Sequence, residues 1–266
     1  MNLDLSGKRA LVTGSSGGIG AGIAGALARQ GAHVVVHGRN RAEVAAVAAA
    51  IGRDGGTAQA LVADLRDEAA LAAMTAQLLA DGGVDVLVNN AGQYVNRDWW
   101  QARPADWLAL YAANVTPAVH LTQALVPAMR ARGWGRIIQV ASGEATQPLA
   151  FMPDYAASKA ALVNLTVSLS KALAGTGITA NTVSPGLIAT AGVQAFYRHM
   201  AAEQGWGTAW EQIEQHVLRA VLPNNSGRLG WVEDVADLVA FVASPSAGYI
   251  NGANLRVDGG STRCIN

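Results

Sequence analysis

A short apolar run that passes into a glycine-rich turn and then into an alanine-rich stretch constrains the fold of this chain more than any other feature. Residues 9–13 read RALVT, residues 14–20 read GSSGGIG, and alanines are frequent from there to Gln30. Continuous apolar runs of this kind are typical of strands buried in a parallel sheet. Strand, glycine turn and helix in this order predict a dinucleotide site, because glycines admit a pyrophosphate to the backbone and the helix directs free N–H groups at it.

The same alternation of strand and helix continues along the chain. Strands are expected near residues 8–13, 33–37, 57–63, 84–89, 135–141, 178–183 and 253–257, with helices in most of the gaps. This pattern predicts an α/β fold of Rossmann type, doubly wound, with a mostly seven-stranded parallel sheet flanked by helices. We expect residues 1–266 to form a single NAD(P)-binding domain, because the sequence contains no linker, repeat or low-complexity tract.

The end of the second expected strand bears on the choice of nucleotide. NAD sites usually carry an acidic residue about 20 residues past the glycines, and here residues 38–40 read GRN. The guanidinium of Arg39 suits a 2′-phosphate, which it can meet through a fork of donors. NADP(H) is therefore favoured as the cofactor. NAD(H) stays open, because Arg39 is also compatible with a solvated loop and Gly17 adds no second cation to the turn.

Tyr155 and Lys159 are the candidates for proton chemistry. They are four residues apart and lie one turn from each other on a helix expected from about residue 153 to residue 174. An isolated phenol has a pKa near ~10, and a nearby ammonium is expected to lower it toward the working range. Ser142 ends the strand before this helix, so its hydroxyl can polarise a carbonyl group.

Several motifs occur together in one order along the chain. They are Thr13-Gly14-x3-Gly18-Ile19-Gly20, Asp64-Leu65, Asn89-Asn90-Ala91-Gly92, Asn114, Ser142, Tyr155 with Lys159, Pro185-Gly186 with Thr190, and Val257-Asp258-Gly259-Gly260. In this order they resemble the short-chain dehydrogenase/reductase family, including its 3-oxoacyl reductase-like members, from about Leu5 to Gly260.

The resemblance implies roles for individual residues. Tyr155 is implied as the general acid or base, with Lys159 lowering its pKa and binding the nicotinamide ribose. Asn114 is implied to hold a water that links Lys159 to solvent. The catalytic residues implied are Asn114, Ser142, Tyr155 and Lys159. The cofactor-binding residues implied or expected are Gly14, Ser16, Gly18, Ile19, Gly20, Arg39, Asp64, Leu65, Asn90, Ala91, Gly92, Tyr155, Lys159, Pro185, Gly186, Ile188 and Thr190. A homo-oligomer, tetramer or dimer, is implied by the helix that carries Tyr155.

The substrate is the least constrained part of the interpretation. We expect a lid at about residues 191–227, whose aromatic residues either line a pocket or pack the lid against the core. Candidate substrate contacts are Gln93, Tyr94, Glu144, Met152 and Tyr197. The first hypothesis is an NADP(H)-dependent enzyme that interconverts a carbonyl and a secondary alcohol. The alternatives are an NAD-dependent dehydrogenase of a polyol, sugar or hydroxylated ring, and a non-catalytic NADP-sensing protein.

Composition argues against other classes of partner. The formal net charge is +0, with 19 basic and 19 acidic residues, so we expect no nucleic-acid partner. No run approaches the ~20 apolar residues of a membrane span.

The 5 histidines lack metal-ligand spacing, so no metal is expected. Cys264 is the single cysteine, and residues 1–8 lack the apolar core of a signal peptide, which together predict a cytoplasmic protein.

Overall fold

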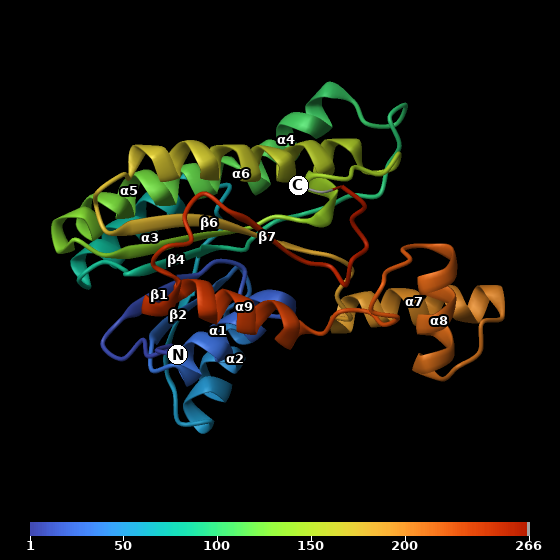
Figure 1. Ribbon diagram of the computed structural model, residues 1–266, viewed down its shortest axis with the longest axis horizontal. Helices are drawn as coiled ribbons and strands as arrows, with labels where there is room; N and C mark the ends of the chain where they lie inside the picture. The colour runs from blue at the N-terminus through green and yellow to red at the C-terminus, as the bar shows by residue number, and fades with distance from the viewer. Residues whose placement is uncertain (265–266) are drawn as a thin grey trace.

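The computed structural model describes residues 1–264 and shows a parallel sheet with helices on both faces (Figure 1). The strands are β1 (Arg9–Val12), β2 (His33–Gly38), β3 (Thr57–Val62), β4 (Val86–Asn89), β5 (Gly135–Val140), β6 (Ile178–Pro185) and β7 (Asn254–Val257). The helices are α1 (Gly18–Arg29), α2 (Arg41–Arg53), α3 (Glu68–Ala80), α4 (Pro104–Asn114), α5 (Thr116–Arg132), α6 (Pro153–Ala172), α7 (Ala191–Gln204), α8 (Trp210–Ala220) and α9 (Val232–Ala243), with 3-10 turns at Gly143–Ala145 and Pro245–Ala247.

The strand order is β3-β2-β1-β4-β5-β6-β7, and each neighbouring pair is parallel. The order reverses at β1, where Val12 is in register with Val36 of β2 on one side and Val88 of β4 on the other. A reversal of this kind opens a crevice at the carboxyl ends of the two central strands. The predicted doubly wound, seven-stranded sheet is confirmed.

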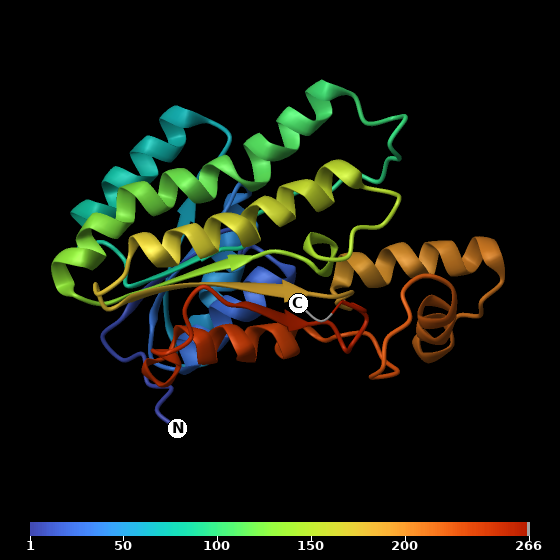
Figure 2. The same cartoon turned by 45° about the horizontal axis from the view of Figure 1, so that its top comes forward.

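Alternation along the strands divides the core into two layers. In β1, Ala10 and Val12 join the cluster beneath α1, α2 and α9, whereas Leu11 joins the cluster beneath α3 and α5. Val35 of β2 and Leu87 of β4 follow Leu11 to the same side. Successive side chains of a strand point to opposite faces, so these buried apolar strands need a helical layer on each face. Figure 2 shows the two layers on either side of the sheet.

The element boundaries differ from the sequence prediction by a few residues. β6 extends to Pro185, two residues beyond the expected end, because Pro185 is still in register with Val257 of β7. Leu162 of α6 and Leu173, directly after that helix, pack within this chain: Leu162 is buried against Ala118 of α5, and Leu173 lies in the layer beneath α3 and α5.

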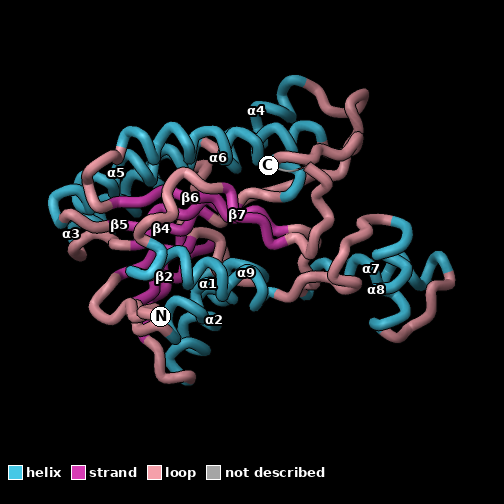
Figure 3. The backbone as a smooth tube through the Cα atoms, viewed as in Figure 1, coloured by secondary structure: helices cyan, strands magenta, loops and turns pink. Residues whose placement is uncertain are grey.

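Helices α7 and α8 form a small body beyond the carboxyl ends of the strands (Figures 1 and 3). Tyr197 and Ala201 of α7 pack against Ile213 and Val217 of α8. Trp206 and Trp210 lie against the same cluster, whereas Phe196 is 53% exposed. Most aromatic residues of the expected lid therefore pack the two helices together.

No helix among residues 1–264 is long and apolar enough to cross a membrane.

Gly20, in the first turn of α1, lies against the backbone of the preceding turn. A β-carbon at Gly20 would overlap the carbonyl oxygen of Gly14 and would lie 2.5 Å from the amide nitrogen of Asn90. Gly25, further along the same helix, would place a β-carbon 3.5 Å from the flexible Arg29 side chain. The helix can therefore approach the turn only where residue 20 lacks a side chain.

We predict that Gly20→Ala lowers the free energy of unfolding by about 1–3 kcal/mol, because the methyl group forces the turn and helix apart. The matched control Gly25→Ala is expected to raise it by roughly 0.5–1 kcal/mol, since alanine restricts the unfolded chain without a clash. Urea unfolding followed by circular dichroism measures both. A Gly20→Ala protein as stable as wild type would contradict the close approach.

Candidate active site

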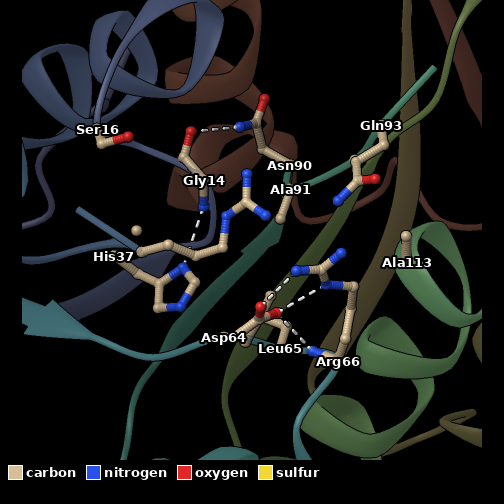
Figure 4. Close-up of a pocket in the computed structure, with 13 residues that line it drawn as sticks. Gly14, Ser16, His37, Asp64, Leu65, Arg66, Asn90, Ala91, Gln93 and Ala113 are labelled. Atoms are coloured by element: carbon tan, nitrogen blue, oxygen red, sulfur yellow. Dashed lines mark hydrogen bonds and ion pairs between the residues drawn. The ribbon is translucent and has the colours of Figure 1, made fainter. Parts of the chain in front are cut away.

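The glycine turn after β1 is tied to the end of β4. Asn90 Nδ2 donates a hydrogen bond to the Thr13 carbonyl oxygen at 2.9 Å. It also donates to the Gly14 carbonyl oxygen at 3.1 Å (Figure 4). Thr13 Oγ1 accepts bonds from the backbone amides of Asn90 and Ala91, both at 3.0 Å. Gly14 has φ of +63°, and a β-carbon there would lie 2.9 Å from Ala91 Cα. The two segments thus form an open cradle that side chains would fill.

A cavity of about 210 Å³ continues from this cradle. It is lined by Gly14, Ser16, His37, Gly38, Arg39, Asp64, Leu65, Arg66, Asn90, Ala91, Gly92, Gln93 and Ala113. The glycine cradle, the helix N-terminus of α1 and the exposed Arg39 provide the donors and space that a dinucleotide phosphate requires. The residues present therefore fit a nicotinamide dinucleotide.

Asp64 lines this cavity and forms an ion pair with Arg66. Arg66 Nη2 lies 2.6 Å from Asp64 Oδ2 and Arg66 Nε lies 3.0 Å from Oδ1, as Figure 4 shows. The hydrogen bonds from Arg66 lower the pKa of Asp64 to about 2, and Arg39 adds a smaller electrostatic contribution in the same direction. Arg39 and Arg66 therefore place two cations beside one carboxylate at this end of the cavity.

His37 contacts the glycine turn through a hydrogen bond with its backbone. It is buried at the end of β2, and its Nδ1 accepts a hydrogen bond from the backbone amide of Gly14 at 3.2 Å. Burial lowers the pKa of His37 to about 4, against smaller opposing contributions from Ala63 and Asp64. His37 is therefore neutral at physiological pH and holds Nδ1 free of a proton, as the bond from Gly14 requires.

The segment after β6 faces the glycine turn from the other side. Gly186 donates its amide to Val257 at 2.9 Å, and Ile188 pairs with Gly230 in an isolated bridge. Thr190 caps α7 by accepting the amide of Val193, and its methyl group lies 3.6 Å from the position of a β-carbon on Gly18. The expected cofactor residues of this segment therefore lie across from the glycine turn.

Asn114 is fixed by three hydrogen bonds. Its Oδ1 accepts the amide of Gln93 at 2.7 Å, and its Nδ2 donates to the Gln93 carbonyl and to Ser158 Oγ, each at 2.9 Å. Asn114 is the last residue of α4, separated from α5 by Val115 alone, and is buried. Ser158 Oγ in turn donates to the Tyr155 carbonyl at 2.7 Å. The structure thus connects Asn114 with the helix that carries Tyr155 and Lys159.

Lys159 and Tyr155 have pKa values that burial controls. Lys159 Nζ donates to the Val140 carbonyl at 2.8 Å and lies 5.8 Å from the centre of the Tyr155 ring. Burial lowers the pKa of Lys159 to about 8. Burial raises the pKa of Tyr155 to about 12, although a hydrogen bond from Ser142 lowers it in part. The pKa of Tyr155 thus lies above its ordinary value and not below it as expected, because the phenol is desolvated and Lys159 is not among the groups that shift it.

The candidate substrate contacts do not form one group. Tyr94 is 67% exposed and lies edge-on to Tyr155, with 6.1 Å between ring centres. Glu144 is half-buried, accepts the Leu149 amide at 2.8 Å, and has a raised pKa because of burial. Tyr197 is buried in the α7–α8 cluster. Gln93 lines the nucleotide cavity (Figure 4).

Met152 lies directly before α6 and has a left-handed backbone conformation with φ of 62°. It lies in the turn that leads into the helix of Tyr155, and within the described part of the chain it forms no hydrogen bond with the other candidate substrate residues.

Sequence reasoning missed several residues that shape the site. His37, Arg66 and Arg97 are not among the residues that the sequence motifs predict; Arg97 lies in the loop after β4 and forms ion pairs with Asp106 and Asp154. His37 directly precedes Gly38-Arg39 at the end of a buried strand, which is a signal that could have identified it. Arg66 follows Asp64 by two residues, but the sequence contains no sign that the two side chains pair. Residues 1–264 contain no cluster of three or more side chains arranged to hold a metal ion.

A family model described as short chain dehydrogenase matches residues 8–201. This chain belongs to the short-chain dehydrogenase/reductase family. It is an oxidoreductase of the class that acts on CH–OH or carbonyl groups. The resemblance drawn from the sequence motifs is thereby confirmed.

Individual members of this family match the chain over nearly its whole length. A 3-oxoacyl-(acyl-carrier-protein) reductase from Haemophilus influenzae is 35% identical over 258 residues, which cover 96% of this chain and 98% of that protein. The structure of L-sorbose reductase from Gluconobacter frateurii, complexed with NADPH and L-sorbose, is 33% identical with a TM-score of 0.93 and covers 100% of both chains. A gluconate 5-dehydrogenase from Burkholderia cenocepacia, in complex with NADP and tartrate, is 31% identical with a TM-score of 0.84 and covers 99% of this chain and 98% of that chain.

We predict that His37 makes the stability of the enzyme depend on pH. Between pH 6.5 and about 4 the unfolded chain binds a proton on this histidine and the folded chain does not. Stability therefore falls as the pH falls through this window, by about 3 kcal/mol at 1.36 kcal/mol per unit. In His37→Asn the amide oxygen can accept the hydrogen bond from Gly14 but does not titrate. This variant is expected to lack the part of the pH dependence of stability that comes from His37.

Denaturant unfolding at pH 7 and pH 4.5 compares the two proteins. Other groups titrate equally in both, so the difference between the two pH dependences isolates His37. Identical pH dependence in wild type and His37→Asn would show that His37 is not held neutral.

Proposed function

We propose that the chain is an NADP(H)-dependent oxidoreductase that interconverts a carbonyl and a secondary alcohol, with Tyr155 as the general acid and base. One observation carries the proposal: Lys159 Nζ lies 5.8 Å from the centre of the Tyr155 ring and donates to the Val140 carbonyl at the end of β5, two residues before Ser142, while burial of the phenol keeps it in the protonated form at neutral pH. A protonated phenol at this place is a proton donor for a carbonyl oxygen.

The proposed mechanism assigns one task to each side chain. When bound, the reduced nicotinamide supplies the hydride to the carbonyl carbon. Ser142 holds the carbonyl oxygen, and Tyr155 gives that oxygen a proton as negative charge develops on it. Lys159, whose Nζ donates to Val140 next to the strand end, restores the proton to Tyr155 with the help of Asn114. In the direction of oxidation Tyr155 accepts the proton instead.

The cofactor-binding residues proposed are those of the glycine turn, the ends of β2, β3 and β4, and the segment after β6. Arg39 is exposed at the rim of the cavity, where its guanidinium can bind a 2′-phosphate. Arg66 brings a second cation to the same rim while it pairs with Asp64. NADPH or NADP in the two solved relatives supports this choice of nucleotide.

We propose a small hydroxylated ketone as the substrate. L-sorbose reductase matches the chain over its full length, including the α7–α8 segment, and it is complexed with L-sorbose. The exposed hydroxyl group of Tyr94 lies beside Tyr155, where it can bind a hydroxyl group of such a ketone, since the two rings are edge-on with 6.1 Å between their centres. We assign α7 and α8 the role of a lid over the mouth of the site. A 3-oxoacyl thioester is the second candidate, favoured by the identity with the 3-oxoacyl reductase.

We also propose that the enzyme works as a homodimer or homotetramer. Leu108 and Trp100 are 73% and 94% exposed, and Val167 of α6 is 38% exposed. Charged residues make up only 14% of the chain. A surface with these features is suited to contact between subunits. Light scattering coupled to size-exclusion chromatography tests the assembly.

We predict that Arg39→Asp weakens NADPH binding by about 10- to 100-fold, because charge-assisted bonds to the 2′-phosphate are lost and a carboxylate repels it. NADH binding is expected to change little or to improve. The matched control is Arg41→Asp at the exposed start of α2, which changes the same charge two residues away. Quenching or enhancement of nicotinamide fluorescence gives both dissociation constants. Tighter binding of NADH than NADPH by the wild-type enzyme would refute the phosphate assignment.

We predict that Tyr155→Phe lowers kcat by about 10²- to 10⁴-fold, because the ring remains and only the proton donor is removed. Its dissociation constant for NADPH is expected to stay within about twofold of wild type, since proton transfer takes no part in binding. Steady-state reduction of L-sorbose, other ketoses and a 3-oxoacyl thioester, each with NADPH, identifies the substrate class. A variant with wild-type turnover would exclude Tyr155 as the donor.

A further inference from the structure

Three charged side chains form a row beside the first turn of α6. Arg97, in the loop after β4, places Nη1 2.7 Å from Asp106 Oδ1 and Nε 3.6 Å from Asp154 Oδ2. The side chain of Asp154 has 0% exposure and that of Arg97 has 16%. A fully buried carboxylate is costly unless a positive charge faces it. Arg97 supplies that charge.

Asp154 connects this row to the backbone of Tyr155. Its Oδ1 accepts a hydrogen bond from the Tyr155 amide at 2.9 Å, in the first turn of α6. The first amides of a helix have no partner within the helix, and the positive end of the helix dipole favours a carboxylate there. The position of Asp154 therefore affects the position of the residue that carries the phenol.

The backbone of the same loop is attached to the start of α6 as well. The amide of Met152 donates to the Arg97 carbonyl at 2.8 Å, and Asp98 forms an antiparallel bridge with Phe151. Met152 has φ of 62°, a conformation that residues with a β-carbon adopt only when their surroundings impose it. Side chain and backbone of Arg97 thus both restrain the turn that enters the helix.

The other end of the loop reaches Asn114. Gln93 exchanges two backbone hydrogen bonds with the Asn114 amide group, and Tyr94 lies edge-on to the Tyr155 ring. One loop therefore contacts both Asn114 and the helix of Tyr155. A change in its attachment to α6 is expected to move Tyr155 relative to the other side chains of the site.

We propose that Arg97 is a positioning residue for the reaction: through Asp154 it holds the first turn of α6, and with it the Tyr155 hydroxyl, in place relative to Ser142 and Lys159. The inference rests on the proposed function, since it concerns the geometry of the proposed proton donor. Arg97 acts through Asp154 and not by contact with the reacting atoms. Asp106 shares the guanidinium and keeps Arg97 oriented toward both helices.

The test is a double-mutant cycle of Arg97→Gln and Asp154→Asn, with NADPH binding measured beside steady-state turnover. Arg97→Gln is expected to lower kcat by about 10- to 100-fold, as small displacements of a catalytic group do, with the NADPH dissociation constant within about twofold of wild type. Adding Asp154→Asn to Arg97→Gln is expected to cause no further loss of kcat, because the ion pair between residues 97 and 154 is already broken. Hydrogen exchange at residues 153–159 is expected to become faster in Arg97→Gln.

The matched control is Arg103→Gln, which removes an exposed partner of the same Asp106 and leaves the contact with Asp154 intact. Its kcat is expected to stay within about twofold of wild type. Arg97→Lys keeps the positive charge but lacks the forked donors of a guanidinium. Its kcat is expected to lie between those of wild type and Arg97→Gln. If Arg97→Gln does not fold, the pair Asp154→Asn and Arg97→Gln/Asp154→Asn completes the comparison, because neither leaves a buried carboxylate without a partner.

Three results would overturn the inference. The first is a wild-type kcat in Arg97→Gln, and the second is a double variant whose fold-loss in kcat equals the product of the two single losses. The third is unchanged hydrogen exchange at residues 153–159 in Arg97→Gln. Failure of the proposed function is distinguishable. In that case the wild-type enzyme turns over no carbonyl substrate, while the exchange measurement still reports whether Arg97 holds the first turn of α6.

Discussion

The reversal of strand order between β1 and β4 is the constraint on which the rest of this structure depends. The two strands are neighbours, yet the chain leaves them toward opposite faces, so their carboxyl ends open a crevice that no crossover covers. Thr13 and Asn90 join the two ends and fix the glycine turn above them. The glycine turn, Asp64, Ser142 and the segment after β6 all lie at this edge because every strand of the sheet points the same way.

Burial dominates the electrostatics of this edge. It favours the neutral form of His37, of Lys159 and of Tyr155, and in each case desolvation is the first cause of the pKa shift. For His37 the neutral form serves structure, because only an unprotonated Nδ1 can accept the Gly14 amide. For Tyr155 it serves the proposed chemistry, because a protonated phenol can donate. Structural support and proton donation therefore depend on the same exclusion of water.

The elements around the mouth of the site differ in how they are held. The loop between β4 and α4 is attached on both sides, by Gln93 to Asn114 and by Arg97 to the start of α6. Helices α7 and α8 instead bury their aromatic residues against each other and extend beyond the sheet (Figure 1). The loop thus joins Asn114 to the helix that carries Tyr155, whereas the proposed lid has a small core of its own. This division suits an enzyme whose substrate enters past the lid and reacts at a fixed phenol.

The sequence by itself determined the fold and predicted the chemical groups of the candidate site. Strand periodicity, the glycine turn and the spacing of Tyr155 and Lys159 are local, so they can be recognised without coordinates. Tertiary structure alone decided the surroundings of those groups: the pairing of Arg66 with Asp64, the bond between Gly14 and His37, and the ion pair that joins Arg97 to Asp154. It also decided the pKa of Tyr155, because desolvation depends on every segment packed around the phenol and not on the lysine four residues away.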